Sequence, residues 1–202
     1  ADFGSDTLFG GNGQDTLGGN EADDIIFAGN GDDQAWGGAG NDHVLGGDGN
    51  DTLGGREGND TLEGGNGDDE IWSNFGDDFA SGGIGDDLIG GSGGDDTLMG
   101  GSGDDTLLGS YGEDHLWAGS GHDVLTGGNR SDVFHFRVQE DTNQITDFEL
   151  NDLIHIHALE TGYNNLEIDQ LGNDAVISFQ GTEIILEDFA VANIFEDLFV
   201  FG

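Results

Sequence analysis

A nine-residue unit recurs without insertion or deletion from residue 1 to residue 135. Residues 46–54 show it in full, in the order Gly-Gly-x-Gly-x-Asp-x-apolar-x, and fifteen copies follow one another. A unit this short cannot bury a face of its own, so neighbouring copies have to stack on each other. The period therefore predicts a repeat architecture with one continuous core over the first two thirds of the chain.

Aligning the copies separates positions with chemical roles from positions with packing roles. Position eight is apolar in every copy, and position four is Gly except at Ala22 and Arg130. Position six is Asp in every copy, and these residues are Asp6, Asp15, Asp24, Asp33, Asp42, Asp51, Asp60, Asp69, Asp78, Asp87, Asp96, Asp105, Asp114, Asp123 and Asp132.

The glycines indicate a tight loop, because they tolerate positive φ and leave backbone carbonyls uncovered. Positions seven to nine then predict a three-residue strand whose middle side chain points into the core. A loop and a strand reverse the chain once, so copy n is expected to stack on copy n+2. We predict an all-β fold, a right-handed parallel β-roll with two short-stranded sheets and about seven turns. Ala35 and Ala80 would be weak spots in its thin core.

Stacking brings the position-six carboxylates of copies n and n+2 together, for example Asp42 beside Asp60. Their repulsion requires a hard cation with six or more oxygen ligands, which favours calcium over magnesium, up to about 13 ions in all. The carbonyls of positions two and four complete the predicted ligand set. These are the carbonyls of Gly11, Gly13, Gly29, Gly31, Gly38, Gly40, Gly47, Gly49, Gly65, Gly67, Gly83, Gly85, Gly101, Gly103, Gly119 and Gly121.

The charge of the chain excludes several partners. Forty-three acidic residues against three basic ones give a formal charge of −40, so nucleic acid and anionic lipid lack a basic footprint to bind. An acidic composition is also typical of disordered chains. A disordered chain would not need Asp at the same position of every repeat, so this regularity favours a folded structure. There is no cysteine, and no apolar run of about 18 residues predicts a membrane span.

No catalytic constellation is found in the sequence. Residues 90–94 match Gly-x-Ser-x-Gly, but this run lies in the phase of the repeat. His155 and His157 share one strand face, and with no third ligand in view we interpret them as surface side chains. The chain is predicted not to be an enzyme, and any catalytic domain would lie upstream of residue 1, where the repeat is already in phase.

Apolar side chains recur at the outward positions of the odd-numbered copies. Such a face is a candidate contact surface for an upstream domain, for the C-terminal segment or for a second copy of the chain. Its main members are Phe9, Phe27, Leu45, Phe79, Met99 and Trp117.

From residue 136 glycine becomes scarce, and alternating apolar patterns predict longer strands. We divide the chain into a roll at 1–135 and a C-terminal β-rich cap at 136–202, which covers the last core layer. Gly181 and Thr182 are expected to join the last two strands. The expected strands are residues 144–148, 152–157, 166–168, 175–180 and 183–189.

The nonapeptide resembles that of the RTX proteins, which are calcium-binding proteins secreted by bacterial type I systems and include the serralysin-type proteases. Residues 131–136, 145–148 and 152–156 are similar to the segment that follows the repeats in that family. Residues 196–202 resemble its uncleaved export signal. The resemblance implies a Gram-negative source, export of the unfolded chain through an ABC transporter, and folding in extracellular calcium.

Two functions stay open from the sequence. The first is a calcium-binding module that folds outside the cell and serves an activity located upstream of residue 1. The second is a self-assembling extracellular structural protein, such as a surface-layer or filament subunit, that associates through the apolar face. The mass in solution at high calcium separates them, because only the second gives growing assemblies.

Overall fold

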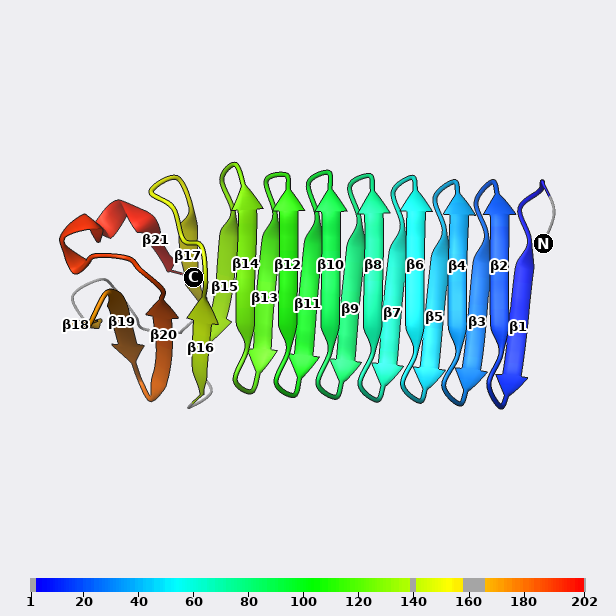
Figure 1. Cartoon of the computed structure of the whole chain (residues 1–202), viewed down its shortest axis with the longest axis horizontal. Coiled ribbons are helices and arrows are strands. Elements are labelled where there is room, and N and C mark those ends of the chain that lie inside the picture. Colours follow the sequence, from blue (N-terminus) through cyan, green and yellow to red (C-terminus); the bar gives the residue numbers. More distant parts are fainter. Residues whose placement is uncertain (1–2, 139–140, 158–165, 202) are drawn as a thin grey trace.

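The computed structural model describes residues 3–138, 141–157 and 166–201. Two parallel sheets face each other and run the length of the chain, with the N-terminus at one end and a differently built C-terminal part at the other (Figure 1). Over the repeats, successive strands alternate between the two sheets, so the chain winds as a solenoid of about eight turns. The predicted parallel β-roll is therefore confirmed.

The odd-numbered strands form one sheet and the even-numbered strands the other, except that one odd-numbered strand of the cap, β19, lies in the second sheet. In order, the first sheet holds β1 (Thr7–Asn12), β3 (Ile25–Asn30), β5 (His43–Asp48), β7 (Thr61–Asn66), β9 (Phe79–Ile84), β11 (Thr97–Ser102), β13 (His115–Ser120), β15 (Val133–Arg137), β17 (Leu153–His157) and β21 (Phe199–Phe201). The second holds β18 (Glu167–Leu171), β19 (Asp174–Phe179), β20 (Thr182–Leu186), β16 (Thr142–Ile145), β14 (Val124–Asn129), β12 (Thr106–Tyr111), β10 (Leu88–Gly93), β8 (Glu70–Phe75), β6 (Thr52–Glu57), β4 (Gln34–Ala39) and β2 (Thr16–Glu21).

The register follows the predicted pairing of copy n with copy n+2. Leu8 pairs with Ile26 on β1 and β3, and Leu53 pairs with Ile71 on β6 and β8. The stack then continues past residue 135, because β16 pairs with β14 and β17 with β15. These added layers explain why the solenoid is longer than the seven turns predicted from the repeats alone.

The predicted three-residue strands are wrong in length, because each repeat strand except β15 has six residues and extends through position three. The register between β3 and β5 pairs positions seven, eight and nine, skips position one, and resumes at positions two and three. Because the copies are parallel and in register, the backbone N–H and C=O groups of positions two and three meet those of the neighbouring copy whatever their side chains are. Glycine at position two therefore does not end the strand.

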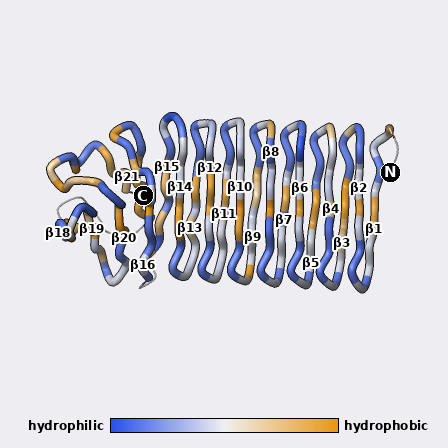
Figure 2. Tube along the Cα trace, in the orientation of Figure 1, coloured by the Kyte–Doolittle hydropathy of each residue, from blue (hydrophilic) through white to orange (hydrophobic). Residues whose placement is uncertain are grey.

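The core of the roll is a thin layer of position-eight side chains. Figure 2 shows hydrophobic residues along the middle of the strands and hydrophilic residues at the turns. The two predicted weak spots, Ala35 and Ala80, are both fully buried. Position one also faces inward and is small throughout the roll, as at Ala28 and Ala118, so it adds little apolar area.

The cap has a thicker core and a different topology. β18, β19 and β20 pair antiparallel, and Gln180 and Gly181 form the two-residue turn between β19 and β20 with φ of 48° and 94°. Two short 3₁₀ helices, η2 (Val191–Asn193) and η3 (Glu196–Leu198), lead into β21. Phe148 packs against Phe134 of the roll and against Phe189 of the cap, with ring centroids 6.0 Å and 5.3 Å apart.

The predicted cap strands are present, with shifted bounds. The strand expected at residues 144–148 is β16 and ends at Ile145, because Thr146 begins a turn in which the Asp147 carboxylate accepts the N–H groups of Gly127 and Gly128. The strand expected at 166–168 is β18 and runs to Leu171. The final residue of the predicted export signal lies outside the described part of the chain.

Candidate calcium sites

The loops between strands have one backbone conformation, repeated along the stack. Gly47 at position two and Gly49 at position four have φ of 119° and 129°, in the region that disfavours side chains. Ala22 and Arg130, which interrupt the glycine of position four, adopt the same region at 71° and 90°. The stack therefore imposes this conformation even where glycine is missing. Position two behaves in the same way at Asn20, Arg56, Asn74, Ser92 and Ser110.

The position-six aspartates form one ladder along each side of the roll. Their side chains are buried from Asp24 onward and half-buried at the N-terminal end. The N–H of Asp42 donates to Oδ1 of Asp60 over 2.8 Å, and that of Asp51 donates to Oδ1 of Asp69 over 2.8 Å. The same contact recurs between residues 18 apart from the first aspartate to the last. The structure thus brings together the pairs that the sequence predicted.

The second oxygen of each of these carboxylates, Oδ2, is buried. Among the described residues, Oδ2 of all fifteen position-six aspartates has no hydrogen-bond partner. A buried acceptor left unpaired is unfavourable, and an ionised one more so. A row of such atoms on one chain indicates a ligand of positive charge.

Position one provides the space for Oδ2, which the sequence reasoning missed. A Cβ added to Gly19 would overlap both Oδ2 of Asp24 and the carbonyl oxygen of Gly37 in the next turn. The same clash recurs at Gly46, where Oδ2 of Asp51 and the carbonyl of Gly64 lie. Position one is Gly, Ala or Ser in every copy, and this restriction to small residues was visible in the sequence, but nothing local shows that the position borders a carboxylate.

The carbonyls predicted as ligands lie against the next turn of the stack. A Cβ on Gly29 would overlap the carbonyl oxygen of Gly11, and one on Gly31 that of Gly13. Both positions repeat this approach from turn to turn, up to Gly119 and Gly121. The loops therefore place backbone and carboxylate oxygens side by side, which is the donor set that calcium prefers.

Burial makes ionisation of the ladder unfavourable. It raises the pKa of Asp96 to about 8, and the nearby carboxylates of Asp114 and Asp78 add to the shift although the Asp78 N–H opposes it. Burial likewise raises the pKa of Asp42 and of Asp51. It raises the pKa to about 7 at Asp60, Asp69 and Asp105, and to about 6 at Asp78, Asp87, Asp114, Asp123 and Asp132.

The ladders end on cap residues that the sequence reasoning did not assign. Oδ1 of Asp152 accepts the N–H of Asp132, and Oδ1 of Asn143 accepts the N–H of Asp123. The offset here is 20 residues, because the connections after residue 135 are longer. Oδ2 of Asp152 differs from the repeat pattern in that it accepts the N–H of Glu149. An acidic residue directly before an apolar strand was the available signal for Asp152.

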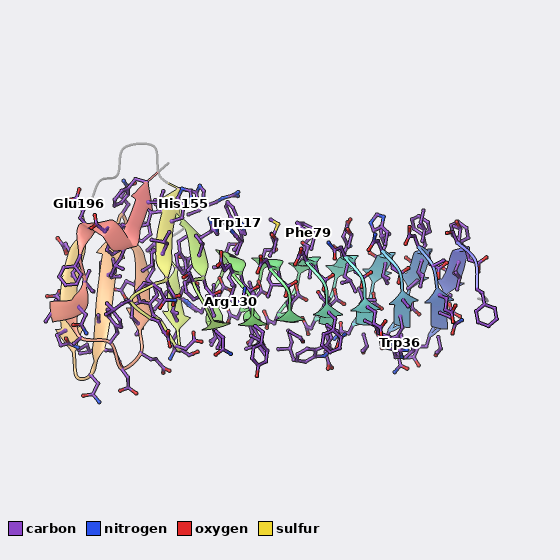
Figure 3. All side chains as sticks on the ribbon, turned by 90° about the horizontal axis from the view of Figure 1, so that it is seen from above. Trp36, Phe79, Trp117, Arg130, His155 and Glu196 are labelled. Atoms are coloured by element: carbon purple, nitrogen blue, oxygen red, sulfur yellow. The ribbon has the colours of Figure 1, made fainter. Side chains whose placement is uncertain are left out.

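The apolar face of the first sheet is interrupted. Phe9 and Phe27 are exposed, and their rings stack with centroids 5.1 Å apart. Along the same row of paired positions, the polar residues Glu63 and Ser81 separate Leu45 from the next apolar pair, which is Met99 and Trp117. Figure 3 shows Phe79, Trp117 and His155 on one side of the ribbon and Trp36 on the other. The face is therefore a set of separate groups, and self-assembly through it is not favoured.

Fold and loops together define a calcium-binding β-solenoid of stacked nonapeptides. The profile of the RTX calcium-binding nonapeptide repeat matches four times, at residues 1–21, 18–53, 54–89 and 90–125. The chain belongs to this family, and its repeats bind calcium. The repeat region is a structural calcium-binding module rather than a catalytic one.

Two solved structures are similar to the chain at low sequence identity. The extracellular lipase LipA from Serratia marcescens aligns with 89% of this chain at 17% identity and a TM-score of 0.41, and the chain spans 40% of the lipase. The AlgE6R3 subunit of the Azotobacter vinelandii mannuronan C5-epimerase aligns with 67% of this chain and 78% of its own length, at 24% identity and a TM-score of 0.42. A search of curated proteins found no match. Among the described residues, no helix has the length and apolar character needed to cross a bilayer.

Proposed function

We propose that calcium ions lie between successive turns and are bound by the position-six carboxylates together with loop carbonyls of positions two and four. The observation that carries this proposal is the ladder of buried Oδ2 atoms without hydrogen-bond partners. Up to about 13 ions would fit between the fifteen loops. They would add about 26 positive charges and offset most of the repulsion in a chain of net charge −40.

We further propose that calcium binding drives folding and that folding takes place outside the cell. The metal-free ladder holds many carboxylates in a buried row, so the folded chain is unfavourable where calcium is scarce. Extracellular calcium-binding modules have dissociation constants of about 10⁻⁴ to 10⁻³ M, which suits the millimolar calcium outside cells. Binding free energy then becomes folding free energy. Export through an ABC transporter as an unfolded chain, guided by residues 196–202, would be consistent with this order of events.

The ligand assignment is tested by Asp51→Ala, because Asp51 bonds to the turn before it and the turn after it. Its Oδ1 accepts the N–H of Asp33, and its own N–H donates to Asp69. Calorimetry is expected to show a lower calcium stoichiometry and a higher calcium midpoint than in the wild type. Asp32→Ala removes the same charge from an exposed side chain that bonds to the N–H of Asn50, and it is the matched control. Equal calcium binding in the Asp51→Ala variant and the wild type would contradict the assignment.

Circular dichroism tests the coupling to folding. The chain in calcium is expected to show a strong β signal that excess chelator removes and added calcium restores. Magnesium at the same concentration is expected to restore little, because it demands near-octahedral geometry and dehydrates reluctantly. A chelated chain that keeps its full β signal would exclude calcium-driven folding. The ligand assignment is tested separately, by the calorimetry of Asp51→Ala.

A further inference from the structure

Four imidazoles gather on the outer face of the first sheet, where the repeats meet the cap. His115 lies on β13, His135 on β15, and His155 and His157 on β17. Each pair of neighbouring strands is in parallel register, and His135 is the direct partner of His155. The sequence offered no third ligand beside His155 and His157, and the fold supplies a third imidazole in His135, from 20 residues earlier than His155 in the chain.

The distances between these rings match a shared ion. One nitrogen each of His135, His155 and His157 lies within 4.8 Å of the other two. Nδ1 of His135 and Nε2 of His157 are 3.0 Å apart, close to the roughly 3.3 Å between two nitrogens bound to one tetrahedral ion at 2.0–2.1 Å. The rings of His155 and His157 stack with centroids 3.9 Å apart, and both side chains are only partly buried. Small side-chain rotations therefore bring a ring nitrogen of His155 within reach of the same ion.

His115 and Trp117 hold the central imidazole in place. Nδ1 of His115 is 2.9 Å from Nε2 of His135, and the tautomer in which Nε2–H donates to His115 leaves Nδ1 of His135 bare toward His157. A metal-binding imidazole is usually oriented in this way through its other nitrogen. The indole of Trp117 stacks on His135 at 4.0 Å and nearly parallel, which fixes the plane of the ring.

We propose that His135, His155 and His157 form a site for one divalent transition-metal ion of the class that imidazole favours, such as Zn²⁺ or Cu²⁺, distinct from the calcium sites. Calcium takes hard oxygen ligands, whereas imidazole nitrogen suits zinc, copper and nickel. The ion ties β15 to β17 and so links the last repeat to the cap. Three protein ligands leave the fourth position of a tetrahedral ion open to solvent.

The charges around the site include one that opposes cation binding and others that favour it. Arg137 lies over Trp117, with its guanidinium carbon 5.7 Å from the ring centroid, and its positive charge opposes a dication. The net charge of −40 raises the local concentration of divalent cations around the whole chain.

A zinc titration of the full chain in saturating calcium tests the site, because calcium then occupies the carboxylates. The wild type is expected to bind one Zn²⁺ saturably, and the double variant His155→Gln/His157→Gln to bind it at least tenfold more weakly. His43→Gln is the matched control, since His43 is an outward residue of the same sheet and pairs with Glu63 at 3.2 Å. Circular dichroism and the calcium stoichiometry of each variant verify that the fold is kept.

Tryptophan fluorescence gives a second readout. Bound Cu²⁺ quenches a nearby indole, so quenching is expected in the wild type and is expected to be much reduced in Trp117→Phe, in which Trp36 and Trp72 remain. Three results would overturn the proposal. They are no saturable binding in calcium, binding by the double variant equal to that of the wild type, and an equal loss in His43→Gln.

Discussion

The roll and its cap are built from the same two sheets but are stabilised differently. In the roll each turn contributes one position-eight side chain per strand to a thin core, together with a buried carboxylate. In the cap, aromatic residues such as Phe148, Phe179, Phe189 and Phe199 fill a thicker core, and β18 to β20 pair antiparallel. The roll therefore buries a row of carboxylates whose desolvation and mutual repulsion oppose the metal-free fold, whereas the cap relies mainly on apolar burial.

Calcium removal has the largest expected effect, and it should fall unequally on the two regions. With excess chelator, amide hydrogens of β3 to β13 are expected to lose protection from exchange, because the ladder between them loses its cations. Amides of β19 and β20, which form a two-residue-turn hairpin, are expected to stay the most protected. Hydrogen exchange with mass spectrometry measures both. Equal loss of protection in both regions would show that roll and cap form one cooperative unit.

Acid should partly replace calcium. In the folded state burial raises the pKa of Asp96 to about 8 and that of Asp60 and Asp69 to about 7, against an ordinary value near 3.8. The folded chain therefore binds more protons than the unfolded chain between pH 3.8 and pH 8, and stability falls as pH rises through this window. Circular dichroism of the chelated chain is expected to show more β structure at pH 5 than at pH 8. A signal that does not change with pH would contradict the burial of these carboxyls in the metal-free state.

Phe148→Ala tests the cap. The ring packs against Phe134 and Phe189, and its loss is expected to lower the free energy of unfolding by about 3–5 kcal/mol. Urea unfolding in saturating calcium measures this loss, and the calcium stoichiometry is expected to stay at the wild-type value. A drop in stoichiometry as large as that of Asp51→Ala would show that the cap core and the calcium ladder depend on each other.

The smallest expected effect is a difference in stability between substitutions at two adjacent glycines of the roll. A Cβ at Gly19 meets Oδ2 of Asp24 and the carbonyl of Gly37, so Gly19→Ala is expected to destabilise the chain by about 1–3 kcal/mol and to weaken calcium binding. A Cβ at Gly18 meets nothing within 4 Å, so Gly18→Ala is expected to change stability by less than about 1 kcal/mol. Urea unfolding at fixed calcium compares them. Similar values for the two variants would mean that position one does not border the site.

Much of the fold and of the site could be predicted from the sequence because the repeat carries its own register. The nine-residue period, with Asp and an apolar residue at fixed positions, is sufficient to predict that Asp42 meets Asp60 and that Leu53 meets Ile71. Strand length was not predictable in this way, since backbone pairing at positions two and three depends on the neighbouring turn and not on the residues present. The inward direction of position one was likewise not visible in the order of residues.

The stacking of alternate copies, the thin core and the calcium chemistry follow from the order of residues, because each depends on a local spacing that is repeated fifteen times. Where the repeat stack ends, and which residues meet there, follows only from the folded chain. Asp152 and Asn143 continue the ladders at a changed offset, and His135 joins His155 and His157 across β15 and β17. These contacts depend on the lengths of the connections beyond residue 135, which no period fixes, so only the folded chain brings those residues together.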